Sequence, residues 1–170
     1  KIVNDFIQVF PNIKHVVYDS IQSDAALNAY EKYYGIRGLA DYDFSKAKTI
    51  VSIDADFLGD WQGGGYESSY ASSRMPNGDQ KKAHMSQHFQ FESNLSLTGA
   101  NADYRSPCNP SDQKNILAFI YDSLTGGDVR ELPEDLRPLA QKALSALIKS
   151  GTKGVLVSGI EDEVAQATVL

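Results

Sequence analysis

The sequence contains only one cysteine, Cys108, among its 170 residues. A single cysteine excludes an internal disulfide and any zinc or iron–sulfur site built from four cysteines of this chain. No apolar run approaches the roughly 18 residues that are typical of a transmembrane helix. Basic residues are the scarcer charge, with 16 Lys and Arg against 22 Asp and Glu and a net charge of −6. This balance disfavours nucleic acid and anionic lipid as partners, because both require a basic face.

Short apolar segments alternate with amphipathic segments along the chain. The clearest predicted strand is 48–53, because its run of Thr, Ile and Val suits a sheet covered on both faces. The other predicted strands are 15–18, 87–92 and 154–158. Helices are predicted over 1–10, 23–35, 66–73, 111–124, 134–149 and 162–170, and a long irregular stretch over 97–110. The alternation predicts an α/β fold with a three-layer, mostly parallel, doubly wound sheet of the Rossmann-like type.

We expect a single domain over residues 1–170, since no repeat, low-complexity segment or internal boundary interrupts the pattern. A helical pattern is already under way at the first residue. Another stops at Leu170 without a capping residue. We therefore expect a fragment of a larger protein, truncated at both ends, and not a complete catalytic unit.

An acidic pair, Asp54 and Asp56, follows directly after the predicted strand 48–53. This pattern is typical of magnesium-dependent phosphotransferases of the haloacid-dehalogenase type. In those enzymes the first Asp attacks phosphorus and the second acts as acid and base. Ser158 would supply the phosphate-binding hydroxyl, but it leaves no room for the later lysine and the acidic metal pair. The alternative is that both aspartates cap a loop and accept hydrogen bonds from backbone amides.

The loop after that strand matches two other kinds of site only in part. It resembles a calcium loop, but Leu58 and Gly65 occupy positions where oxygen ligands belong. Its three consecutive glycines, 63–65, could cradle a phosphate. They lie too far from the strand end, however, for the tight turn of a dinucleotide site. We expect these glycines to give the loop conformational freedom beside Trp61.

The histidines give little support for metal binding or catalysis. His84 and His88 have the spacing of a helical metal pair, but a strand over 87–92 would turn their rings apart. The alternative is a pair of hydrogen-bonding surface or loop histidines. No serine lies in a Gly-x-Ser-x-Gly turn, so a Ser-His-Asp triad is not supported. We expect no catalytic residue and no metal ligand in this domain.

Several segments together resemble one protein family. They are 10–19, 25–35, 38–47, 54–61 and 86–105. Over most of its length the chain is similar to the molybdopterin-oxidoreductase-like portion of the large iron–sulfur subunit of alternative complex III. That complex is a quinol:electron-acceptor oxidoreductase, and the subunit falls within the dimethyl-sulfoxide-reductase-type molybdopterin superfamily. The most specific matches are Asp54-Ala-Asp-Phe-Leu-Gly-Asp-Trp61 and Leu97-Thr-Gly-Ala-Asn-Ala-Asp103.

The resemblance implies a pocket in which loops after the strands would hold the nucleotide half of a pterin cofactor. The corresponding positions here are Asp54, Asp56, Glu92, Thr98, Asp103 and Asp112. The family's Gly-x-Asn-Pro loop is replaced by Asp-Ala-Asp-Phe, and its Pro-Gly-Thr-Asp motif by Pro-Ser-Asp. A phosphate needs bare amides and little negative charge nearby. The carboxylates therefore imply a vestigial pocket that has lost its cofactor.

The resemblance further implies a degenerate scaffold domain of a respiratory iron–sulfur electron-transfer subunit. The isolated domain would be inactive, molybdopterin would be lost, and the iron–sulfur clusters would lie elsewhere in the parent chain. Its partners would be the parent's iron–sulfur domain and other subunits of a membrane-bound complex on the periplasmic side of the bacterial inner membrane. We expect no nucleic-acid partner and no direct membrane insertion.

Two alternative functions stay open at this stage. The domain could still bind molybdopterin guanine dinucleotide, or it could be the magnesium-dependent phosphotransferase that uses Asp54 and Asp56. For the scaffold function, aromatic side chains near the glycine loop are expected to anchor interfaces, with ordinary core packing as the alternative. These residues are Phe57, Trp61, Tyr66 and Tyr70.

Overall fold

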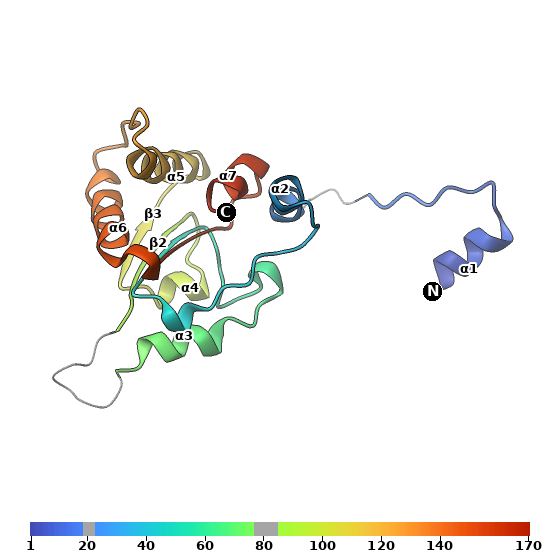
Figure 1. Ribbon diagram of the computed structural model, residues 1–170, viewed down its shortest axis with the longest axis horizontal. Helices are drawn as coiled ribbons and strands as arrows, with labels where there is room; N and C mark the ends of the chain where they lie inside the picture. The colour runs from blue at the N-terminus through green and yellow to red at the C-terminus, as the bar shows by residue number, and fades with distance from the viewer. Residues whose placement is uncertain (19–22, 77–84) are drawn as a thin grey trace.

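The computed structural model describes residues 1–18, 23–76 and 85–170 and contains one parallel sheet (Figure 1). Its strands are β1 (Thr49–Ile53), β2 (Gln87–Glu92), β3 (Tyr104–Pro107) and β4 (Gly154–Ser158). Their spatial order is β3-β2-β1-β4, and every neighbouring pair is parallel. Helices cover both faces, which confirms the predicted three-layer, Rossmann-like α/β fold.

The central strand, β1, is buried along its whole length. Its Ile and Val side chains meet apolar layers on both faces, as expected for a parallel strand covered by helices on each side. Ile53 is in register with Phe91 of β2 and with Ser158 of β4. This register places the loops that follow these three strands at one edge of the sheet.

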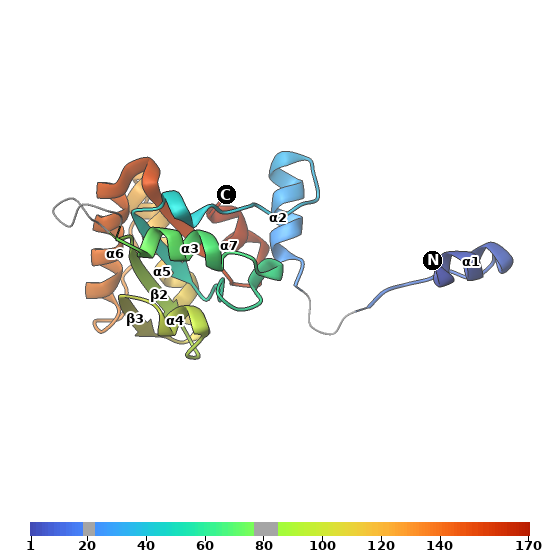
Figure 2. The ribbon, with the colours of Figure 1, turned by 90° about the horizontal axis from the view of Figure 1, so that it is seen from below.

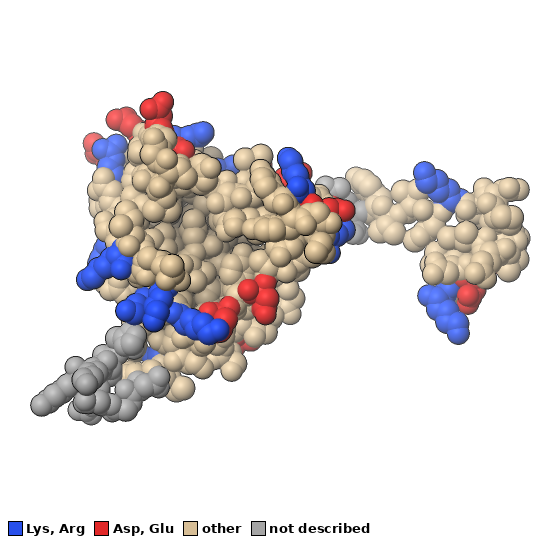
Figure 3. All heavy atoms as spheres, viewed as in Figure 1, with Lys and Arg blue, Asp and Glu red and all other residues tan. Residues whose placement is uncertain are grey.

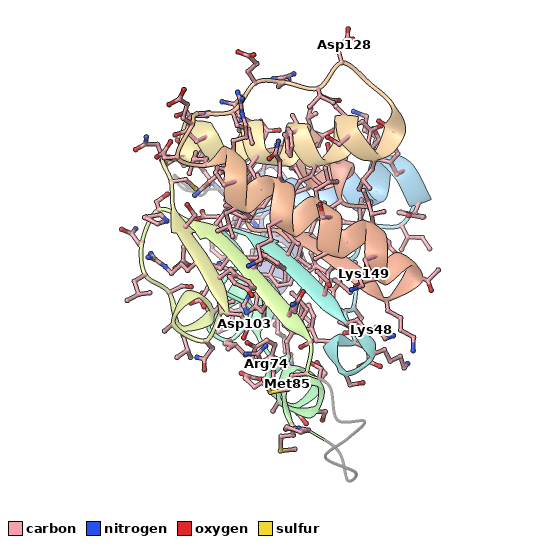
Figure 4. The ribbon with its side chains drawn as sticks, turned by 90° about the vertical axis from the view of Figure 1, so that its left-hand side faces the viewer. Lys48, Arg74, Met85, Asp103, Asp128 and Lys149 are labelled. Carbon is pink, nitrogen blue, oxygen red and sulfur yellow. The ribbon has the colours of Figure 1, made fainter. Side chains whose placement is uncertain are left out.

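One face of the sheet is covered by α5 (Pro110–Thr125) and α6 (Arg137–Ser150), which lie above the sheet in Figure 4. The apolar stripe of α6 repeats at helical spacing, and its buried members Ala140, Ala143 and Leu147 pack against the core. They join Val51, Phe89 and Ile116 in the larger of two apolar clusters.

The other face is covered by α3 (Glu67–Arg74), α4 (Leu97–Ala100) and the short 3₁₀ helix η1 (Phe44–Lys46). These elements lie below the sheet in Figure 4. Phe44 and Phe57 are fully buried in the second apolar cluster, with ring centroids 4.5 Å apart. Tyr66 and Tyr70 close this cluster from the side of α3.

Two helices pair beside the sheet. They are α2 (Ala25–Tyr34) and α7 (Glu163–Thr168), and Figure 2 shows them next to each other. Lys32 of α2 forms an exposed ion pair with Glu163 of α7. Gly35 ends α2 in the left-handed conformation, as the sequence predicted. None of the helices in the described part of the chain is long and apolar enough to cross a membrane.

One predicted strand was wrong, and one strand of the sheet was not predicted. Residues 15–18 are irregular and exposed, and they lie with α1 (Ile2–Val9) away from the body in Figure 1. Their apolar, β-branched side chains have no neighbouring strand, and a strand needs a partner for its backbone groups. The strand that was not predicted is β3, which lies inside the stretch 97–110 that was expected to be irregular. Its sequence, Tyr-Arg-Ser-Pro, suits only a short edge strand that ends at proline.

Candidate functional site

The ends of β1, β2 and β4 bring together the residues that the sequence assigned to a cofactor pocket. In parallel sheets, ligands bind at this carboxyl edge, where neighbouring loops diverge. Asp54 follows β1 and Glu92 ends β2, while Ser158 ends β4. The geometry of these groups determines what this edge can bind.

Asp54 is hydrogen-bonded through its carboxylate to α5, one of the two helices that cover the first face of the sheet. Its backbone has φ 58°, a left-handed conformation that aspartate tolerates better than most residues. Its Oδ1 accepts a hydrogen bond from Gln113 Nε2 of α5 at 2.8 Å. Burial raises the pKa of the Asp54 carboxyl, and the hydrogen bonds from Ser93 and Gln113 act against that rise. The carboxylate is thus committed to fixing α5 against the end of β1.

Asp56 and Thr98 tie the loop after β1 to α4. Asp56 Oδ1 accepts a hydrogen bond from the backbone N–H of Thr98 at 2.9 Å, and Thr98 Oγ1 accepts one from Leu58 N–H at 2.8 Å. The Asp56 carbonyl also accepts from Gly59 N–H. This is the loop-capping arrangement expected as the alternative to a catalytic pair. Because the Asp56 carboxylate already accepts the hydrogen bond of the Thr98 amide, that amide is not available to a phosphate.

Glu92 forms a nearly buried ion pair. Its carboxylate is 2% exposed and contacts Arg105 Nε at 2.5 Å. Ser96 Oγ donates a second hydrogen bond at 2.5 Å, and Gln90 Nε2 donates a third at 3.1 Å. Burial alone would raise the pKa of Glu92, but the bonds from Ser96 and Arg105 outweigh it and hold the pKa below its ordinary value. Glu92 is therefore ionised and fully engaged by protein groups.

A buried polar chain runs along β2 from Glu92 to Tyr70. His88 and Gln90 are both fully buried, and His88 Nε2 lies 3.3 Å from Gln90 Oε1. Because the Glu92 carboxylate only accepts hydrogen bonds, Gln90 must direct its NH₂ toward Glu92 and its Oε1 toward His88. His88 then donates from Nε2, and the single proton of the Tyr70 hydroxyl is shared between His88 Nδ1 at 3.1 Å and the Asn101 carbonyl at 3.0 Å.

Sequence reasoning placed His88 at the surface or in a loop and did not find this chain of buried polar side chains. The expectation for His88 was wrong, because the ring faces the layer of α3 and not solvent. The signal was present as His-x-Gln-x-Glu in a predicted strand, since alternate residues of a strand share one face. His84, its predicted metal partner, lies outside the described residues. Among the described residues, no three Asp, Glu, His or Cys side chains converge as metal ligands.

The burial of His88 predicts a pH-dependent stability. Burial lowers the pKa of His88 to about 4, against the hydrogen bond with Gln90, which acts to raise it. The unfolded chain therefore takes up a proton near pH 6.5, whereas the folded chain does not until near pH 4. Stability should fall between these values as pH is lowered, by up to about 1.4 kcal/mol per pH unit from this group.

Urea unfolding of the chain and of His88→Asn between pH 7 and pH 4 checks this expectation. The variant should be less stable at pH 7 but should lose less stability on acidification. An equally steep loss in both proteins would show that other groups cause the pH dependence.

Asp103 does not join the carboxyl-edge group, whereas Asp112 lies at the same edge, in the helix that follows β3. Asp103 precedes β3 at the amino edge of the sheet, and Arg74 contacts both of its oxygens, at 2.6 and 2.8 Å (Figure 4). Asp112 lies in the first turn of α5, accepts from Asn109 Nδ2, and lines an open hollow of about 410 Å³ beside Cys108. Burial raises the pKa of the Cys108 thiol to about 12, so the thiol stays protonated and unreactive.

The crevice between β1 and β4 is closed by backbone contact. The chain passes from β1 to β2 on one side and later returns to β4 on the other, so the loops diverge between β1 and β4. At this point Gly159 lies directly on the loop after β1. A Cβ on Gly159 would collide with the Asp54 carbonyl and stand 2.9 Å from Ala55 Cα. Ser158 is fully buried and accepts from Ile160 N–H, so it is not presented to a phosphate.

No protein-family model and no curated protein matches this chain. The resemblance to the molybdopterin-oxidoreductase-like subunit therefore rests on the segments quoted above. The residues at the carboxyl edge do not fit the pyrophosphate of a pterin nucleotide. Asp56 occupies the Thr98 amide, Glu92 and Asp54 add negative charge, and Gly159 closes the crevice.

The aromatic residues expected at interfaces belong mainly to the core. Phe57, Tyr66 and Tyr70 are at most 8% exposed, so nearly all of their surface is buried within the domain. Trp61 is only partly buried, and its ring lies 5.5 Å from the rings of Tyr42 and Tyr66. The core-packing alternative is correct for the first three residues. The adjacent glycines 63–65 all have positive φ, so they permit the tight path of this loop.

Proposed function

We propose that this domain is a degenerate molybdopterin-oxidoreductase-like scaffold of a respiratory iron–sulfur electron-transfer subunit and is not itself catalytic. In this role it would position an iron–sulfur domain of the same parent chain and neighbouring subunits of a quinol-oxidising complex. That complex would lie on the periplasmic side of the inner membrane. The clusters would be carried elsewhere, since Cys108 alone cannot hold one.

The observation that carries this proposal is that three carboxylates at the carboxyl edge already accept hydrogen bonds from the protein's own groups. Asp54 is bound by Gln113, Asp56 by the Thr98 amide, and Glu92 by Arg105 and Ser96. One carboxylate at about 4 Å from a phosphate costs about 1 kcal/mol in water and several times more in a partly buried cleft. Two or three such carboxylates would offset most of the roughly 8 kcal/mol that corresponds to micromolar binding.

The same contacts argue against the phosphotransferase alternative. A nucleophilic Asp must reach phosphorus, and the Asp54 carboxylate instead faces Gln113 and the Ser93 amide. The second Asp must exchange protons with the substrate, and Asp56 accepts from a backbone amide. What these residues do is connect β1 to α5 and to α4, which is a structural role.

A titration with guanosine diphosphate tests the proposal, because this ligand represents the nucleotide half of the pterin cofactor. We expect the backbone ¹⁵N–¹H signals of Ser93, Thr98 and Gly159 to show no saturable shift at millimolar ligand. Signals of residues at the amino edge of the sheet, such as Ser86, report separately on binding at any other place.

Saturable micromolar shifts of those three amides would overturn the scaffold proposal. The domain would then retain a nucleotide pocket at its carboxyl edge. Loss of the shifts in Thr98→Pro, which removes the amide that Asp56 now occupies, would assign the binding to this loop. Asn101→Ala, at the exposed end of α4, serves as the matched control.

A further inference from the structure

A basic hollow lies at the amino edge of the sheet, opposite the edge described above. Its volume is about 460 Å³, and no Asp or Glu is among the described residues that line it. We call it the lysine hollow. Its polar lining includes Lys46, Lys48, Lys153, Ser45, Ser72 and Thr152. Figure 3 shows a group of Lys and Arg side chains at this end of the body, although the whole chain carries a net charge of −6.

Backbone pairing holds two of the lysines side by side. Lys48 N–H donates to the Lys153 carbonyl at 2.8 Å, directly before β1 and β4 begin. Neighbouring residues on paired parallel strands point to the same face, about 5 Å apart. Thr49, the next residue, faces α6, so Lys48 and Lys153 face the layer of α3, where Ser72 lies. Like charges in this arrangement repel each other, and a bound anion would relieve the repulsion.

The ion pairs of the region leave these two lysines available. Lys46 contacts Asp43 at 2.9 Å, whereas neither Lys48 nor Lys153 forms an ion pair with any described residue. Ser73 and Ser86 also line the hollow, but their hydroxyls are engaged by the protein, because Ser73 Oγ donates to the Tyr70 carbonyl and lies 3.0 Å from Ser86 Oγ. The lysines are therefore the groups that can bind a ligand with many acceptor oxygens, and lysine ammonium groups are common phosphate ligands.

We propose that the lysine hollow binds a small molecule that carries a diphosphate group. Two lysines held side by side can each contact one phosphate of a linked pair. The volume lies within the usual range for small-ligand pockets, about 300–1,000 Å³. The hollow therefore has room for a diphosphate and for a further group attached to it. This inference is independent of the scaffold function, which concerns the opposite edge.

Calorimetric titration of the 170-residue chain with pyrophosphate tests the proposal. We expect saturable, submillimolar binding that weakens as salt is added, because exposed charges are screened. Lys48→Gln with Lys153→Gln should weaken binding at least tenfold. Lys14→Gln, which removes an exposed lysine far from the hollow, should change the affinity less than twofold. Thr152→Glu, which places a carboxylate on the rim, should abolish binding. This variant provides a second test if the double variant folds poorly.

Parallel titrations identify the ligand class and its source. ADP binding more tightly than pyrophosphate would indicate a nucleotide, and equal affinities would indicate that the diphosphate alone is recognised. Both results support the proposal. It would be overturned by absent saturation with pyrophosphate, by unchanged affinity in the double variant and in Thr152→Glu, or by citrate binding as tightly as pyrophosphate.

Discussion

Replacement of Arg105 by alanine is expected to lower the free energy of unfolding by about 3 kcal/mol at neutral pH. The variant would leave the Glu92 carboxylate buried without its cation, since Glu92 is only 2% exposed. Breaking one partner of a buried ion pair typically costs about 3–5 kcal/mol. The lower end applies here, because Ser96 and Gln90 still donate hydrogen bonds to the carboxylate.

Urea unfolding at several pH values measures this effect and its origin. The pKa of Glu92 is lowered in the folded chain, so its ion pair stabilises the fold above about pH 4 and is lost as pH falls through the folded pKa. The cost of Arg105→Ala should therefore shrink in acid. Arg37→Ala is the matched control, because its ion pairs with Asp24 and Glu31 are exposed and worth less than about 1 kcal/mol. Equal losses in the two variants would contradict the assigned role of the buried pair.

Replacement of Gly159 by alanine is expected to destabilise the domain by about 3 kcal/mol, the upper end of the usual cost of overpacking. The new Cβ would overlap the Asp54 carbonyl and press on Ala55 Cα. These are backbone atoms at the end of the central strand, so no flexible side chain can move aside. The whole loop after β1 would have to shift, and with it the hydrogen bond between Asp56 and Thr98.

Thermal and urea unfolding of Gly159→Ala measure this cost. Gly38→Ala is the control, because nothing lies within 4 Å of its added Cβ and its φ is not positive. The control should change stability by less than about 0.5 kcal/mol. A tolerated alanine at position 159 would show that the crevice between β1 and β4 can open. It would thereby remove one of the three reasons for excluding a nucleotide there.

The predictions for Arg105→Ala and Gly159→Ala concern two different parts of the carboxyl edge of the sheet. Glu92 and Arg105 fix the end of β2 to β3, while Gly159 brings the loops of β1 and β4 into contact. Together they pair the Glu92 charge and close the crevice between β1 and β4, at the edge where Rossmann-like sheets usually bind ligands. The lysine hollow at the opposite edge has the reverse character, because Lys48 and Lys153 form no ion pair with any described residue.

The sequence alone determined the elements whose stability is local or strongly periodic. The β-branched run of β1 and the apolar stripe of α6 predict their own structure, because each must bury a continuous apolar surface. The loop-capping alternative for Asp54 and Asp56 could also be stated in advance, since aspartate after a strand commonly accepts backbone amides.

Tertiary structure alone decided the features that depend on a partner distant in the sequence. Residues 15–18 have strand-like composition but no neighbouring strand, whereas Tyr-Arg-Ser-Pro becomes β3 because β2 lies beside it. Asp103 was assigned to the pocket, yet Arg74 holds it at the opposite edge. Backbone hydrogen bonds across a sheet and ion pairs between elements depend on which segments meet in space. A one-dimensional pattern does not contain that information.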